Sequence, residues 1–148
     1  MRIGVVLLVL WTIANIFLSI RLAQPGPTTV ASADGRTAIQ LPVQARDAVL
    51  AEMRTMLGSV QGVLDAAARS DTAGISTAAK ASGLVMAADP ALARVLPGEF
   101  LQLGMATHQA FDTLAATASA GAGPAVARLA QIASRCVACH ATYRLEVQ

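Results

Sequence analysis

The chain is short of cysteine, histidine, aromatic residues and net charge. Its 148 residues include two cysteines, two histidines, three phenylalanines, one tryptophan and one tyrosine. All nine acidic side chains and nine of the eleven basic ones lie from residue 34 onward, so this region is formally neutral. A neutral region lacks the basic surface that nucleic-acid binding requires. We therefore exclude a nucleic acid as the partner.

The shortage of aromatic residues also limits the core. From residue 34 onward the only aromatic side chains are Phe100, Phe111 and Tyr143, in a background rich in alanine. Aromatic side chains normally supply much of the apolar area that a core buries. We therefore expect the fold to enclose an additional apolar group, without which it would pack loosely.

No strand-like alternation of polar and apolar residues stands out after residue 42. Apolar residues instead recur at spacings of three and four, which predicts helices over about 43–69, 72–88, 99–119 and 124–143. Two short breaks and one longer connector, which contains Asp89-Pro90 and Pro97-Gly98, separate them. The predicted fold is all-α: an antiparallel four-helix bundle over residues 43–148, preceded by an N-terminal hydrophobic helix.

The N-terminal residues form an apolar run from Ile3 to Ile20. Its length of about 18 residues is at the lower limit for spanning a bilayer and exceeds a usual signal-peptide core. Residues 1–21 are therefore predicted to be a signal peptide or a membrane anchor. Ala31-Ser32-Ala33 fits a cleavage site but lies far from the run, which favours the anchor. Residues 22–42, rich in Pro, Gly and small polar residues, predict a flexible linker.

Both cysteines lie in one motif, Cys136-Val-Ala-Cys139-His140. The spacing C-x-x-C-H is the attachment signal for a covalent haem. On a helix the two thiols lie on one face and can add to the two vinyl groups of one haem. The imidazole of His140, one turn from Cys136, can then reach the iron as its proximal ligand. The motif predicts one covalently attached haem c.

Other uses of two cysteines remain as alternatives. A thioredoxin-like redox site needs a βαβ pattern, which the sequence lacks. An intramolecular zinc site needs four ligands and would have to recruit His108 as well as the motif. A disulfide between Cys136 and Cys139 would close a very short loop with little entropic benefit. Covalent haem attachment is the favoured interpretation.

A four-helix body with C-x-x-C-H close to its C-terminus resembles the class II cytochromes c, the cytochrome c prime family. The resemblance covers roughly residues 43–147. It is carried by the motif with the following Tyr143 and Arg144, by a pattern on the third helix, and by spacings on the first helix. The residues on those two helices are Phe100, His108, Phe111 and Asp112, and Arg46, Leu50, Met53 and Gly58.

The resemblance implies that the first helix supplies the residue opposite His140. Aligning Arg46 and Gly58 places Leu50 there, while Met53, one turn further along, is a possible distal iron ligand, and Met56 is a weaker one. The resemblance also places Arg46 near the haem edge, as a candidate propionate partner. Tyr143 is expected in the haem pocket beside the porphyrin, and Arg144, which flanks the motif on the last predicted helix, is a second candidate propionate partner. Arg135 is a further candidate for such a contact, whereas iron ligation by His108 is not expected.

Two functions follow from this resemblance. The first is electron transfer outside the cytoplasm, with redox partner proteins, no enzymatic activity and a possible homodimer. The location would be periplasmic, held to the inner membrane through residues 3–20 if they are not cleaved. The alternative is a five-coordinate haem protein that binds nitric oxide or carbon monoxide. It requires an apolar distal residue such as Leu50, whereas a methionine ligand favours electron transfer.

Overall fold

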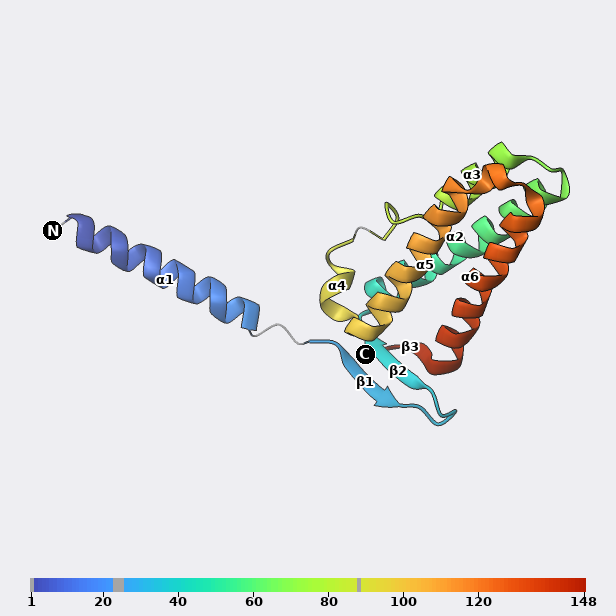
Figure 1. Ribbon diagram of the computed structural model, residues 1–148. Helices are drawn as coiled ribbons and strands as arrows, with labels where there is room; N and C mark the ends of the chain where they lie inside the picture. Colours follow the sequence, from blue (N-terminus) through green and yellow to red (C-terminus); the bar gives the residue numbers. More distant parts are fainter. Residues whose placement is uncertain (1, 23–25, 88) are drawn as a thin grey trace.

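The computed structural model describes residues 2–22, 26–87 and 89–148 (Figure 1). Met1, residues 23–25 and Ala88 lie outside the described residues, as do the side chains at 2, 3 and 20–22. Parts of three expected segments therefore fall outside this description. They are the signal peptide or anchor 1–21, the linker 22–42 and the end of the helix predicted over 72–88.

The described part of the chain is mostly helical, which confirms the predicted fold class in its main part, but it also contains a small sheet. The short helix α4 lies in the connector where no element was predicted. In chain order the elements are α1 (Arg2–Leu22), β1 (Thr28–Ala31), β2 (Thr37–Leu41), α2 (Val43–Ala68), α3 (Thr72–Lys80), α4 (Leu92–Val95), α5 (Gly98–Ala116), the 3-10 turn η1 (Ala118–Ala120), α6 (Ala122–Thr142) and β3 (Tyr143–Val147).

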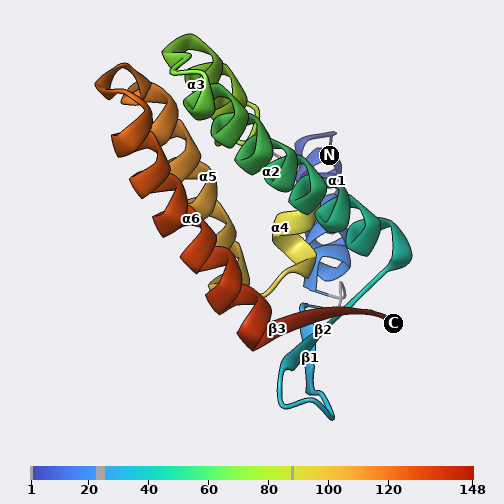
Figure 2. The same ribbon diagram turned by 90° about the vertical axis from the view of Figure 1, so that its right-hand side faces the viewer.

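Four of the helices pack around a common core. Helix α2 contacts α3 and α6, and α5 contacts the same two helices, so the four form a closed ring (Figure 2). Residues three and four apart share one helix face, which explains how the apolar stripes of the sequence meet inside this ring. The largest buried side chains there are Val63, Ile75, Phe111, Leu114, Leu129 and Ile132.

Helix α3 is shorter than the helix predicted over 72–88, because α5 binds the backbone that would have continued it. The imidazole Nδ1 of His108 lies 2.9 Å from the carbonyl oxygen of Ser82. One turn along α5, the carboxylate of Asp112 accepts a hydrogen bond of 2.9 Å from the amide of Leu84. These contacts hold the segment in turns, and tertiary bonds thus replace the helical ones.

The structure corrects the flexible linker expected over residues 22–42, because two strands lie within it. Strands β1 and β2 pair antiparallel, and the turn between them includes Gly35 at a φ of 83°, in the region that glycine adopts without strain. Ile39 and Leu41 of β2 are both 0 % exposed. They pack with Val49 of α2 and Phe100 of α5 in a second apolar cluster. Residues 37–41 of the expected linker therefore belong to the folded core.

Strand β3 was also missed, since its alternation covers only the five residues from Tyr143 to Val147. It pairs in parallel with β2, and Ile39 lies opposite Leu145. Pro42 alone separates β2 from α2, and β3 follows α6 without a break. The sheet therefore joins the first turn of α2 to the last turn of α6 (Figure 1).

Helix α1 extends away from the other helices in Figure 1. Its described side chains, from Gly4 to Ser19, are all exposed. Within the part of the chain that the structure describes, no helix is both long enough and apolar enough to cross a membrane.

Replacing the buried Ile39 with alanine tests whether residues 37–41 belong to the folded core. The change removes a fully buried side chain, so we expect the free energy of unfolding to fall by about 2–5 kcal/mol. Chemical denaturation followed by circular dichroism measures the loss. The matched control is Val30→Ala in β1, where the side chain is 45 % exposed and the change should cost less than about 0.5 kcal/mol. If both changes had equal and negligible effects on the free energy of unfolding, residues 37–41 would be a flexible linker and not part of the core.

Candidate functional site

A cavity of about 570 Å³ lies between α2, α5 and α6. Its size falls within the range of about 300–1,000 Å³ that is usual for ligand and cofactor pockets. Most of the lining is apolar, and the motif on α6 forms one wall. The cavity reaches from Val49 to Val60 on α2, from Phe100 to His108 on α5, and from Ala133 to His140 on α6.

The wall formed by α6 carries the predicted attachment residues. Cys136, Cys139 and His140 all line the cavity, as one helix face requires for positions three and four residues apart. Both thiols are free and partly buried. Burial raises the pKa of Cys136, and burial together with the neighbouring Cys136 raises the pKa of Cys139. Protonated thiols are poor nucleophiles, which argues against a redox-active dithiol.

The wall formed by α2 faces the motif with the residues that the sequence left as distal candidates. Leu50, Met53 and Met56 all line the cavity, and all three are partly buried. A leucine and two thioethers are therefore within the same apolar space as the imidazole of His140. The choice between an apolar distal residue and a methionine ligand thus depends on the position that a bound group would take.

The arginines expected near a haem edge lie in different places. Arg46 pairs with Asp47 at 2.7 Å and does not line the cavity. Arg144 is also outside it, within 3.3 Å of Asp34 and 3.1 Å of Glu146. Arg135, which was the further candidate for a propionate contact, does line the cavity.

Arg54 lines the cavity as well and was missed from the sequence. It lies four residues after Leu50 on α2, which is the signal that could have found it. Neither Arg54 nor Arg135 takes part in an ion pair with another described residue. The two guanidinium groups are the only basic side chains of the cavity lining apart from the imidazoles of His108 and His140.

Tyr143 packs beside the site without lining the cavity. Its ring meets that of Phe100 edge-to-face, with the ring centroids 5.5 Å apart. Phe100 itself lines the cavity. The hydroxyl of Tyr143 donates a hydrogen bond of 3.3 Å to Glu99. Tyr143 therefore supports the end of the cavity nearest the sheet through Phe100.

His108 closes the inner side of the cavity and is only 2 % exposed. Its Nε2 lies 2.9 Å from the carboxylate of Glu52, and its Nδ1 lies 2.9 Å from the carbonyl oxygen of Ser82. Burial alone lowers the pKa of His108, but the hydrogen bonds to Glu52 and Ser82 and the charges of Glu52 and Asp112 together outweigh burial, so the net pKa is raised. A protonated imidazole can donate to both acceptors.

Both ring nitrogens of His108 are thus engaged, so it is not available as the fourth ligand of a zinc site. The described residues contain no group of three or more His, Cys, Asp or Glu side chains that could hold a metal ion by themselves. Glu52 was missed from the sequence. Its place three residues after Val49 and four before Met56, on an apolar stripe, was the available signal.

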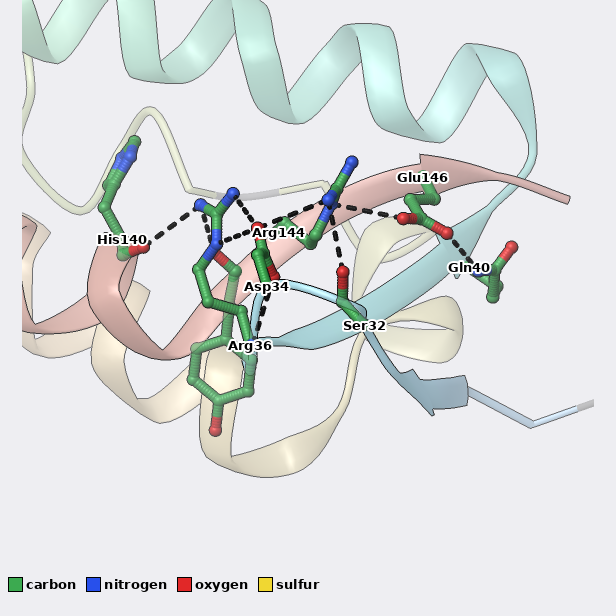
Figure 3. Close-up of polar contacts among 8 residues, drawn as sticks. Ser32, Asp34, Arg36, Gln40, His140, Arg144 and Glu146 are labelled. Atoms are coloured by element: carbon green, nitrogen blue, oxygen red, sulfur yellow. Dashed lines mark hydrogen bonds and ion pairs between the residues drawn. The ribbon is translucent and has the colours of Figure 1, made fainter.

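A network of charged side chains lies beneath the motif, where the hairpin meets α6 (Figure 3). Arg36 donates to the carboxylate of Asp34 at 2.7 and 2.9 Å and to the carbonyl oxygens of His140 and Tyr143 at 3.2 and 3.5 Å. Hydrogen bonds from Arg36 hold the pKa of Asp34 far below its usual range. The carboxylate of Asp34 also contacts Arg144. Nothing in the sequence alone indicated that Arg36 would donate to the carbonyl oxygen of His140.

Comparisons with protein family models, with curated proteins and with solved structures each return no significant match to this chain. The resemblance to the class II cytochromes c therefore rests on the residues and spacings themselves. The cavity gathers two thiols, the imidazoles of His108 and His140, thioethers and an apolar wall, and the thiols with His140 are a donor set suited to a covalently attached haem.

Replacing His108 with glutamine tests the buried ion pair. Because the folded pKa of His108 lies above its ordinary value of 6.5, the pair stabilises the fold fully below about pH 6.5 and loses its contribution as the pH rises through the folded pKa. We expect the wild type to exceed His108→Gln in unfolding free energy by roughly 1–3 kcal/mol at pH 5.5. Denaturant titrations should show this difference shrinking at alkaline pH. A difference that grew with pH would contradict the assignment.

Proposed function

We propose that this protein is a c-type cytochrome with one covalently attached haem, which transfers electrons outside the cytoplasm. The proposal takes the fold to be the cytochrome c prime-like form of the antiparallel four-helix bundle. The observation that carries it is the gathering of Cys136, Cys139, His140, Leu50 and Met53 around one apolar cavity. These residues are up to 90 positions apart in sequence, yet each was selected from the resemblance or the motif alone.

The residues present suit one haem of the c type. Cys136 and Cys139 would form the thioether bonds, and His140 would hold the proximal position. Bound haem would supply an iron that cycles between the ferrous and ferric states. Arg54 and Arg135 are suited to pair with its propionates, since guanidinium groups bind carboxylates through parallel hydrogen bonds.

The surroundings of the cavity favour electron transfer over catalysis. The walls are mostly apolar, and the burial of a redox group is one of the factors that set its potential. Peroxidase-like chemistry needs an acid–base group beside the distal position. His108 is the candidate for such a group, but Glu52 and Ser82 engage both of its ring nitrogens. We therefore propose no enzymatic activity.

Residues 1–21 are proposed to remain as an anchor in the inner membrane, with the haem domain in the periplasm. Cleavage after Ala33 would remove strand β1 and Ser32, which accepts a hydrogen bond from Arg144. An intact hairpin therefore favours retention of the N-terminal helix. A membrane anchor would keep the protein at high effective concentration beside redox partner proteins. A homodimer stays a prediction from the resemblance.

Covalent haem attachment is tested by replacing the motif cysteines. We expect the wild type, expressed with a haem-attachment system, to keep its haem on a denaturing gel. The double change Cys136→Ala and Cys139→Ala should abolish the haem stain, because no thioether bond can form. The stain intensity per amount of protein is the measurement.

The control for this experiment lies within the motif. Val137 is 70 % exposed, so Val137→Ala preserves the attachment pattern and should retain full staining. An unstained wild-type protein that is folded and exported would refute the proposed haem function.

The distal side is tested by Met53→Leu, which conserves volume. If Met53 binds the iron, the ferric protein loses the long-wavelength absorption band typical of methionine ligation and becomes five-coordinate. Met56→Leu, at the weaker candidate on the same wall, should leave the spectrum unchanged if Met53 is the ligand; loss of the band in Met56→Leu alone would assign the ligand to Met56. Because Leu50 also lines this wall, a five-coordinate wild type that binds nitric oxide rapidly would favour the gas-binding alternative and contradict simple electron transfer.

A further inference from the structure

The motif lies in the last two turns of α6. The carbonyl groups at this end of the helix need hydrogen-bond donors from outside the helix. The final carbonyls of any helix have no intrahelical donor. Here the amide of Tyr143 closes the turn on the carbonyl oxygen of Cys139. The carbonyl oxygens of His140 and Tyr143 both accept hydrogen bonds from one nitrogen, Nη1 of Arg36, at 3.2 and 3.5 Å.

Arg36 is held firmly in the place from which it makes these contacts. It follows the turn of the hairpin, where the amide of Ser32 donates a hydrogen bond of 2.8 Å to the carbonyl oxygen of Arg36 itself. Its Nε and Nη2 both bind the same carboxylate oxygen of Asp34, which leaves Nη1 for the helix. Arg144, on the strand that follows α6, binds Asp34 from the other side at 3.3 Å.

The contact acts on the backbone of the residue whose side chain faces the cavity. Figure 3 shows the carbonyl oxygen of His140 directed at Arg36, while its imidazole extends away from the network. A cation at a helix C-terminus is favourable because the carbonyl dipoles point toward it. The hairpin thereby restrains the turn that orients the imidazole.

We propose that Arg36 is a positioning residue for His140. It anchors the last turn of α6 to the β1–β2 hairpin and so sets the direction of the imidazole and the electrostatic field on its far side. This inference rests on the proposed haem function for the role of His140. The restraint on the helix end, by contrast, does not need a bound group.

The test uses the full chain in two forms. In the haem-loaded protein, the midpoint potential and the ferric spectrum are compared among the wild type, Arg36→Ala, Arg36→Lys and Arg69→Ala. Loss of a cation near the iron favours the ferric state, so Arg36→Ala should lower the midpoint potential. Arg69→Ala is the charge-matched control, because Arg69 is exposed at the opposite end of α2 and distant charges are screened by salt.

The second form is the haem-free variant with both motif cysteines changed to alanine. Removing Arg36 from it should speed amide hydrogen exchange at residues 140–143 by about fivefold, the effect of losing one hydrogen bond of about 1 kcal/mol. Arg36→Lys keeps the charge but lacks the planar fork, so it should recover the potential more than the protection from exchange. The Arg69→Ala change should alter neither quantity.

The outcomes separate this inference from the proposed function. If Arg36→Ala matches Arg69→Ala in the potential and spectrum of the haem-loaded form and in the exchange rates of the haem-free form, the positioning role alone is overturned. A wild type that carries no covalent haem would overturn the proposed function and with it the role toward His140. A lowered potential together with faster exchange, both confined to the Arg36 variants, is the result expected.

Discussion

The pairing of β2 with β3 is the constraint on which the rest of the arrangement depends. β2 leads through Pro42 into α2, and β3 continues directly from α6. The strand pairing therefore fixes the ends of the two helices whose facing walls carry Leu50 and Met53 on one side and the C-x-x-C-H motif on the other. Side chains reinforce the joint, since Gln40 donates to Glu146 at 2.8 Å across the two strands. Because neighbouring strands lie about 4.8 Å apart, the two walls cannot separate at this end.

The cavity lies between the two apolar clusters of the bundle, because few large side chains fill the space that separates the clusters. One cluster contains Phe111 and Ile132, and the other contains Ile39 and Phe100. Along α2, α5 and α6 the cavity lining falls largely between these clusters. The buried pair of His108 and Glu52 spans α5 and α2 at the inner side of this region. The chain is poor in aromatic side chains, so a bound apolar group in this space would complete the packing that its own residues leave open.

Prediction from the sequence succeeded where a pattern was long and local. The first predicted helix, over about 43–69, corresponds to α2 at Val43–Ala68, because its apolar stripe continues for seven turns. The second was predicted too long, since its end is set by bonds from His108 and Asp112 on a different helix. The strands were missed because each has at most five residues, and a strand this short is stable only when its partner is present. Arg46 was placed at the site by resemblance and Arg144 by its position just after the motif, yet nearby carboxylates hold both of them outside the cavity lining.

The sequence by itself determined the helices of the bundle and the residues that share a face on each, because helical periodicity is a property of the local chain. It also determined that Cys136, Cys139 and His140 share one helix face, since their spacing needs only one helix. The tertiary structure alone decided which groups meet across elements. The engagement of His108 by Glu52 and the contact of Arg36 with the His140 carbonyl both join residues from different elements. Such contacts depend on how the elements pack, and no local pattern encodes them.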